Sequence, residues 1–185
     1  MQVNAQEYLR LMEKAGTLAF FDTEGFGFDA DYGSLLCATV KPYGGEAKTF
    51  KAERPGNDRK LIIDLKKHLE SFDAWCGFYS KGHDIKYINS RALRYGIKPV
   101  EKRPHIDLYF VLKSHLATSR KSQAHLLSWL ECPEQKLSVS AESWNRIKYD
   151  FKKEMKIMEA RCLSDVNGLL NLYERTKHII TDITR

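Results

Sequence analysis

The apolar positions of the first fifty residues predict three short strands in succession. The run Thr17–Phe21 is β-branched, aliphatic or aromatic and carries no charge, so it predicts a buried strand over residues 17–22. Asp29–Gly33 is typical of a turn, and Ser34–Val40 predicts a second strand. A proline and two glycines end that strand before a third near Ala47–Ala52. The pattern therefore predicts an antiparallel meander.

Helical and strand patterns alternate in the rest of the chain. Leu61, Ile62, Leu65 and Leu69 recur at helical spacing. The elements predicted after this helix are, in chain order, a strand over Ala74–Phe78, a loop over Tyr79–His83, a helix from about Asp84 to Gly96, a strand over His105–Tyr109, a helix over Gln123–Glu131 capped by Ser122, and a long helix from about Lys152 or later towards Thr181. A meander followed by such alternation predicts an α/β fold, in which helices pack against a mixed sheet. The 185 residues contain no linker, so we expect one domain over residues 1–185.

Two acids stand at the end of the first predicted strand. Residues two apart in a strand point to the same face, so Asp22 and Glu24 are expected side by side. Two carboxylates this close repel each other unless a cation lies between them, and hard oxygen ligands suit Mg²⁺ or Mn²⁺. The alternative is a strand end that exposes two solvated acids, so the pair by itself does not establish a metal site.

Two further acids come from distant segments of the chain. Asp84 follows a strand and a small-residue turn, in the first turn of a helix, where the helix dipole by itself also favours an acid. Asp165 lies on the apolar stripe of the last helix, where a charge is costly unless it is paired or binds a metal. Its alternative is an ion pair with a nearby arginine or lysine.

These segments together resemble a known family. Asp22-x-Glu24, Tyr79–Ile85 and Cys162-x-x-Asp165-Val166 are similar to the three motifs of the DEDD-superfamily 3′–5′ exonucleases. Within it they resemble the predicted exonuclease branch of the ribonuclease H-like fold, which is related to the proofreading domains of family B DNA polymerases. The connecting segments also match: Asp31–Gly33, His105–Tyr109, and the stretch from Lys136 to Trp144. The resemblance spans about residues 17–178.

The resemblance implies hydrolysis of phosphodiester bonds by two divalent ions, Mg²⁺ or Mn²⁺, at nucleic-acid 3′ ends that are single-stranded or frayed. Asp22, Glu24, Asp84 and Asp165 would be both the metal ligands and the catalytic residues. The family usually places a tyrosine or histidine four or five residues before the last aspartate, and this chain has Arg161 and Ala160 there. An arginine does not act as a base near neutral pH. We therefore expect Arg161 to contact the scissile phosphate or a neighbouring carboxylate.

Four other residues are candidates for substrate contacts. The resemblance makes Phe28 the apolar wedge between the last two bases and Phe26 the less favoured choice, although both could equally be core residues at a strand end. Lys81 is expected on a basic rim that binds the phosphate backbone, unless it is an ordinary solvated charge. His83 stands where the family commonly has phenylalanine, although a single loop histidine is more often incidental.

Composition indicates the kind of partner and the compartment that we expect for this protein, and it leaves three functions open. The net charge of +6 favours nucleic acid as a partner, and nothing identifies a protein partner. No stretch approaches the roughly 20 apolar residues that span a bilayer, and the four cysteines form no C-x-x-C pair, which is typical of a reducing cytoplasm. Besides the exonuclease, the alternatives are a catalytically impaired nucleic-acid-binding module that retains the fold and an endonuclease of related fold.

Overall fold

A five-stranded mixed sheet forms the centre of the computed structural model, which describes residues 4–183. The sheet order is β3-β2-β1-β4-β5. The strands are β1 (Leu18–Phe26), β2 (Ser34–Pro42), β3 (Lys48–Lys51), β4 (Ala74–Gly77) and β5 (His105–Asp107). The first three pair antiparallel as a meander, and β4 and β5 join them in parallel. The mixed α/β sheet that the sequence predicts is confirmed.

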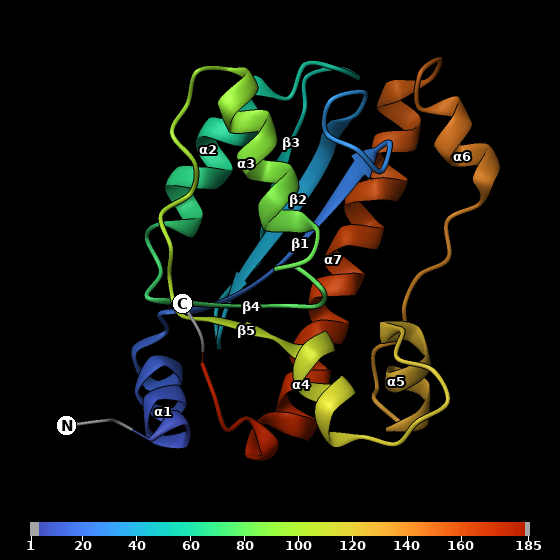
Figure 1. Cartoon of the computed structure of the whole chain (residues 1–185). Helices are drawn as coiled ribbons and strands as arrows, with labels where there is room; N and C mark the ends of the chain where they lie inside the picture. The colour runs from blue at the N-terminus through green and yellow to red at the C-terminus, as the bar shows by residue number, and fades with distance from the viewer. Residues whose placement is uncertain (1–3, 184–185) are drawn as a thin grey trace.

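Helices cover both faces of this sheet (Figure 1). They are α1 (Ala5–Ala15), α2 (Arg59–Leu69), α3 (Asp84–Arg94), α4 (Leu108–His115), α5 (Gln123–Trp129), α6 (Ala141–Arg146), α7 (Phe151–Thr176) and the 3-10 turn Lys177–Ile179. Alternate residues of β1 serve opposite cores: Ala19 and Phe21 pack with α2 and α3, whereas Leu18 and Phe20 pack with α1, α4, α5 and α7. Burial on both sides explains the charge-free sequence of this strand.

Strand β1 is longer than the pattern predicts, and this changes where the acids lie. It continues to Phe26, so Asp22 and Glu24 stand within the strand, Asp22 opposite Thr39 and Glu24 opposite Cys37 of β2. The ladder shifts register between Glu24 and the following glycine. The turn after it requires Gly33, because a Cβ there would lie 2.4 Å from the carbonyl oxygen of Phe26.

The predicted strand over His105–Tyr109 was too long. It ends at Asp107, whose side chain accepts a hydrogen bond from the backbone N–H of Tyr109 and caps α4. Because Asp107 caps α4, Leu108 and Tyr109, which were predicted to end the strand, form the first turn of this helix. The cap predicted at Ser122 is confirmed, since its hydroxyl accepts from the backbone N–H of His125 at the start of α5.

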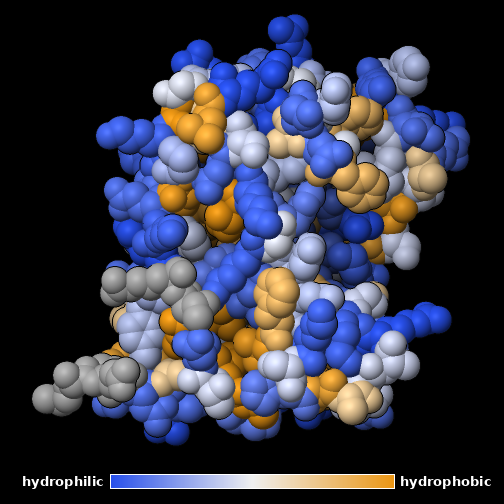
Figure 2. Space-filling model, viewed as in Figure 1, coloured by the Kyte–Doolittle hydropathy of each residue, from blue (hydrophilic) through white to orange (hydrophobic). Residues whose placement is uncertain are grey.

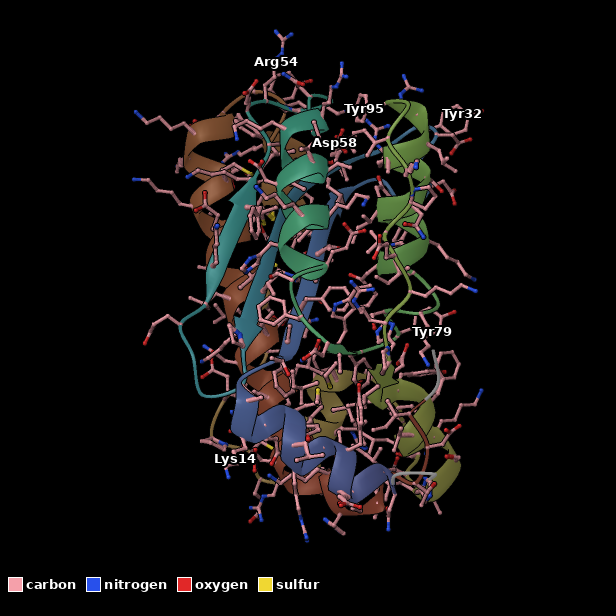
Figure 3. All side chains as sticks on the ribbon, turned by 90° about the vertical axis from the view of Figure 1, so that its left-hand side faces the viewer. Lys14, Tyr32, Arg54, Asp58, Tyr79 and Tyr95 are labelled. Atoms are coloured by element: carbon pink, nitrogen blue, oxygen red, sulfur yellow. The ribbon has the colours of Figure 1, made fainter. Side chains whose placement is uncertain are left out.

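A buried ion pair ties the two helices of one face to the meander. The Asp58 carboxylate, fully buried, accepts hydrogen bonds from Arg91 and Tyr95 of the α3 segment and from the backbone N–H of Leu35 in β2. Figure 3 shows Asp58 and Tyr95 at the same end of α2 and α3. Bonds to three partners satisfy the desolvated carboxylate.

Apolar side chains are distributed unevenly over the surface of the protein. In Figure 2 apolar side chains gather in the lower half of the view, over α4 and the segments beside it. Within residues 4–183, none of the helices combines the length and the apolar character that crossing a bilayer requires.

His105 should make the stability of this protein depend on pH. Burial, with a smaller effect of Lys81, lowers the pKa of its imidazole to about 3. The unfolded chain, with a pKa of about 6.5, then binds more protons than the folded chain between these values, so stability falls as the pH drops through this window. We expect a loss of about 2 kcal/mol between pH 7.5 and pH 5 in urea unfolding.

The variant His105→Gln, which still offers Ser80 a hydrogen-bonding partner, should remove most of that loss. His178→Gln, at an exposed position, is the matched control and should leave the loss unchanged. An equal pH dependence in both variants would assign the acid sensitivity to other groups.

Candidate metal centre and active site

Three carboxylates from β1 and α7 meet on one face of the sheet. Asp22 and Glu24 point to the same face because they are two apart in the strand, and Asp165 reaches them from the helix that crosses that face. One oxygen from each lies within 4.8 Å of the others. Glu24 is 7% exposed and Asp165 only 1%, and Asp22 is half-buried. The structure therefore brings together acids from opposite ends of the sequence, up to 143 positions apart.

Burial and mutual repulsion disfavour the charged forms of these acids. The pKa of Asp22 is raised well above its ordinary value, first by burial and then by the neighbouring Cys162, Asp84 and Glu24. Burial also raises the pKa of Glu24 and of Asp165, although nearby cations act in the opposite direction on both. A cluster with this much uncompensated negative charge is a favourable environment for a further cation.

Asp84 stands beside the three and not among them. Its Oδ1 accepts hydrogen bonds from the hydroxyl and backbone N–H of Thr23, at 2.6 and 3.1 Å. Thr23 alternates with Asp22 and Glu24 along β1, so it faces the side of the sheet that carries α3. The charge of Asp84 still contributes to the raised pKa of Asp22. The sequence predicted four carboxylates in one cluster. The structure brings Asp22, Glu24 and Asp165 together and places Asp84 next to Asp22, outside this group.

Two cations partly neutralise the cluster. Arg161 Nε lies 2.5 Å from Glu24 Oε1 and 3.8 Å from Asp165 Oδ2. Lys136 Nζ lies 2.7 Å from the same Asp165 oxygen. The expectation that Arg161 contacts a neighbouring carboxylate is met.

The donor set fits hard divalent ions. Carboxylate oxygens are the ligands that Mg²⁺ and Mn²⁺ prefer. The second oxygen of Asp165, Oδ1, is buried without a hydrogen-bond partner in the described part of the chain. An orphaned buried carboxylate oxygen is costly, and coordination to a metal ion would satisfy it. Asp22, Glu24 and Asp165 are therefore the residues able to hold a metal here.

A cavity of about 440 Å³ opens beside these acids. Glu24, Arg161, His83, Phe26 and Phe28 are among the residues that line it. Phe28 is 90% exposed, whereas Phe26 is partly buried in the core cluster under α7, with the Lys148 ammonium 4.5 Å from its ring centroid. The Phe28 ring is therefore exposed beside the cavity, whereas the Phe26 ring packs against the core and Lys148.

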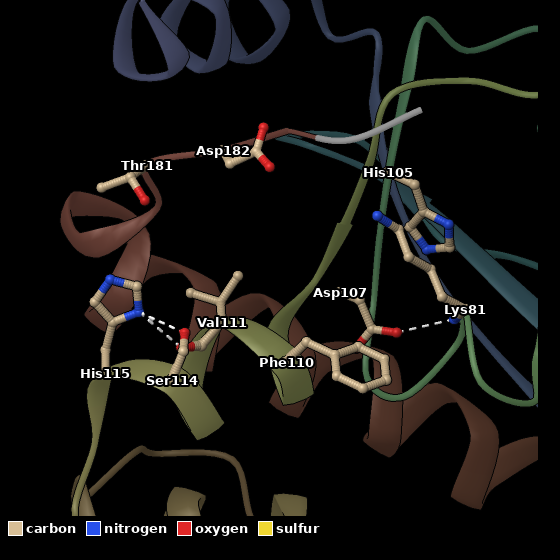
Figure 4. Close-up of a pocket in the computed structure, with 9 residues that line it drawn as sticks. All are labelled: Lys81, His105, Asp107, Phe110, Val111, Ser114, His115, Thr181 and Asp182. Carbon is tan, nitrogen blue, oxygen red and sulfur yellow. Dashed lines mark hydrogen bonds between the residues drawn. The ribbon is translucent and has the colours of Figure 1, made fainter.

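The loop between β4 and α3 is built around one carboxylate. Asp107 accepts hydrogen bonds from the backbone N–H groups of Tyr79 and Lys81 at 2.8 and 2.9 Å. Gly77 is required below this loop, because a Cβ there would lie 2.0 Å from the Ser80 hydroxyl. The Lys81 side chain lines a separate hollow with His105 and Asp107, away from the residues that line the Phe28 cavity (Figure 4).

Lys136 and Trp144 belong to this site, although their types and positions in the sequence indicated no individual role for either. Lys136 contacts Asp165, and the Trp144 ring lines the cavity with the Arg161 guanidinium carbon 5.8 Å from its centroid. Both lie in the segment between Lys136 and Trp144 that contributed to the family resemblance. Residues 133–140 form no helix or strand, so periodicity gave no signal for where Lys136 points.

Comparisons with known proteins agree with this geometry. The family model of the RNase_H superfamily matches residues 19–176. Among solved structures, the chain is similar to the family B DNA polymerase from the hyperthermophilic archaeon Pyrobaculum calidifontis, with a TM-score of 0.69 and 22% sequence identity. The similarity covers 86% of this chain and 24% of the polymerase chain, and at this identity it shows a shared fold. No curated protein matches the chain. The match over residues 19–176 and the mixed sheet with its acidic centre establish that this chain belongs to the RNase_H superfamily.

Proposed function

We propose that this protein is a metal-dependent 3′–5′ exonuclease of the DEDD type, which hydrolyses phosphodiester bonds at the 3′ ends of single-stranded or frayed nucleic acid. The observation that carries the proposal is the group of three carboxylates within 4.8 Å, next to an open cavity with an exposed phenylalanine at its rim. Membership of the RNase_H superfamily and the resemblance to the three exonuclease motifs support the same reaction.

Asp22, Glu24 and Asp165, with Asp84 beside Asp22, are the proposed ligands of two Mg²⁺ or Mn²⁺ ions. When bound, such ions supply Lewis-acid stabilisation of the charge on the phosphate and on the leaving 3′-oxygen, and they lower the pKa of a water. The protein contributes their placement. Strand β1 holds Asp22 and Glu24 side by side on one face, and helix α7 brings Asp165 to the same point.

The other residues of the cavity have roles that follow from their chemistry. Arg161 uses Nε to bind Glu24, and its guanidinium also lines the cavity, where its remaining N–H groups can donate to a phosphate. It orients the acid and holds the substrate, and it does not remove a proton. Phe28 is the proposed wedge between the last two bases.

The ion pairs of Arg161 and Lys136 favour a second candidate function. These cations already neutralise part of the charge of Glu24 and Asp165, which lowers the demand for metal ions. A catalytically impaired module that binds nucleic acid without hydrolysing it would be consistent with this arrangement. The three raised pKa values count against it, because the cluster remains under-neutralised.

A nuclease assay decides between these candidates. Single- and double-stranded DNA and RNA of matched sequence, labelled at either end, are incubated with Mg²⁺, Mn²⁺ or a chelator. We expect a 3′ label to be released as mononucleotide at once and a 5′ label to shorten one nucleotide at a time, with both reactions lost in chelator.

Internal cuts that leave long labelled fragments would replace the proposal with an endonuclease. Binding without cleavage under either metal, measured by fluorescence anisotropy on the same substrates, would support the impaired module.

A further inference from the structure

Three aromatic side chains contact one another on the surface, away from the Phe28 cavity. The ring centroids of Tyr79, Tyr109 and Phe110 are 5.0, 5.2 and 5.8 Å apart in pairs. Tyr79 is 47% exposed and Phe110 45%. We call these three residues the aromatic surface. Clustered rings that remain half in water form no part of the core and mark a place where a ligand can gain by covering them.

The backbone holds this surface in a fixed shape. The Asp107 carboxylate that binds the loop amides of Tyr79 and Lys81 also accepts from the N–H of Tyr109 at 3.1 Å. Tyr79 has a positive φ of 59°, which is uncommon for a residue with a side chain. Its ring lies against the loop, since a Cβ on Gly82 would lie 2.6 Å from that ring. One buried carboxylate thus sets the loop and the first turn of α4 relative to each other.

Hollows with lysine side chains flank the aromatic surface on both sides. One, of about 400 Å³, is lined by Tyr79, Tyr109 and Lys121. The other, of about 330 Å³, is lined by Phe110 and Lys81, together with the acids Asp107 and Asp182. Figure 4 shows Phe110 in the middle of the second hollow, with Lys81 on one side and His115 on the other.

The lysine positions suit a ligand that is both aromatic and anionic. The Lys113 ammonium lies 5.8 Å from the centroid of the Tyr109 ring. Exposed rings bordered by cations are what a chain of bases and phosphates requires: stacking for the bases and positive charge for the backbone.

The aromatic surface and the acidic cluster lie at the same edge of the sheet. β1, β4 and β5 are parallel neighbours, so their carboxyl ends point the same way. The acids lie towards that end of β1, Tyr79 follows β4, and Tyr109 and Phe110 follow β5. Neighbouring strands are about 4.8 Å apart, so this edge extends over about 10 Å from β1 to β5.

We propose that the aromatic surface stacks bases of a single-stranded nucleic acid whose 3′ end lies at the acidic cluster. This inference rests on the proposed function and adds a second contact, away from the bond that is cut. Fixed exposed rings, lysines on both sides and a net charge of +6 favour nucleic acid over a protein as the occupant. Affinity should therefore rise with the length of the single strand until it covers this surface.

Phe110 is the residue to vary, because it lies on α4 and outside the loop that leads into α3 and Asp84. Binding of 5′-labelled oligothymidylates of about 3 and about 12 nucleotides is measured by anisotropy in chelator, so that no hydrolysis interferes. Phe110→Ala should weaken binding of the longer strand about ten-fold, which is within the range of stacking on one ring. Phe110→Leu should weaken it similarly, whereas Phe110→Trp should preserve it.

The matched control is Leu93→Ala, which removes a 62% exposed apolar side chain from α3. It should bind both strands as the wild type does. Circular dichroism and a melting curve of each variant exclude misfolding as the cause.

Three other results of these measurements would contradict stacking of bases on the aromatic surface, or would identify a different occupant of it. Full affinity in Phe110→Leu would show apolar contact without stacking, and equal affinity of wild type and Phe110→Ala for the longer strand would overturn the inference. Loss of a dimer in Phe110→Ala by sedimentation would identify a second copy of this chain as the occupant. Because binding is measured without metal, a wild type that hydrolyses nothing contradicts the proposed exonuclease alone and leaves this test intact.

Discussion

Asp22→Asn is expected to lower the rate of phosphodiester hydrolysis by about 10³-fold or more while raising the melting temperature of the metal-free protein. A metal ligand contributes several kcal/mol of transition-state stabilisation, and each 1.4 kcal/mol corresponds to about ten-fold in rate. The stability gain arises because the carboxylate is disfavoured by burial and by repulsion from its neighbours, as its raised pKa indicates. An amide of nearly the same shape removes that repulsion.

The measurement pairs single-turnover hydrolysis of a 3′-labelled strand with melting curves in chelator. Asp73→Asn, an exposed acid before β4, is the matched control and should change neither quantity. If Asp22→Asn retained wild-type hydrolysis, the chemistry would lie outside this cluster. A fall in melting temperature would mean that Asp22 is bound by a stabilising partner, contrary to the pKa direction.

Arg161→Met is expected to destabilise the metal-free protein by about 2–3 kcal/mol, and added Mn²⁺ should restore most of that loss. Removing one member of a largely buried ion pair leaves the other charge uncompensated, which costs a few kcal/mol. Here the remaining charge is Glu24, 7% exposed and next to Asp165 and Asp22. A divalent ion in the cluster supplies the missing positive charge, so the variant should gain more stability from Mn²⁺ than the wild type does.

Urea unfolding with and without Mn²⁺ measures both effects. Arg146→Met is the control: it breaks an ion pair with Glu142 whose side chains are 56% and 68% exposed, and a surface pair contributes at most about 1 kcal/mol. An equal loss in Arg161→Met with and without Mn²⁺ would show that the guanidinium is a structural partner of Glu24 and that no metal ion shares its place.

The sequence predicted the parts of the fold that depend on local pattern. The charge-free run before Asp22, the break at Pro42 and the cap at Ser122 each have a local physical cause, and the structure contains the corresponding strand, turn and helix. The pairing of Asp22 with Glu24 also followed from strand alternation alone. The same alternation explains why Asp84 meets Thr23, on the opposite face.

The features that were missed depend on tertiary contacts. Lys136 lies in an irregular segment, so only the folded chain shows that it reaches Asp165. The predicted strand from His105 ended early because Asp107 caps α4, and backbone amides of a loop that precedes it by almost 30 positions hold its carboxylate there. Helix α1 is the exception: it was not predicted although its local signals are present, since the Asn4 side chain caps it, Gly16 ends it in the left-handed region, and Tyr8, Leu9 and Met12 pack on the core at helical spacing.

The unbroken course of α7 restricts how this protein can change in length. The 26-residue helix begins at Phe151, crosses the sheet and delivers Asp165 after about four turns. Inserting one residue between these points would rotate the acid by about 100° and move it about 1.5 Å along the axis, so it would leave the cluster. Residues 133–140, without helix or strand, can absorb an insertion more easily. Length variation among relatives should therefore gather before this helix, and α7 should keep a constant number of residues up to its acid.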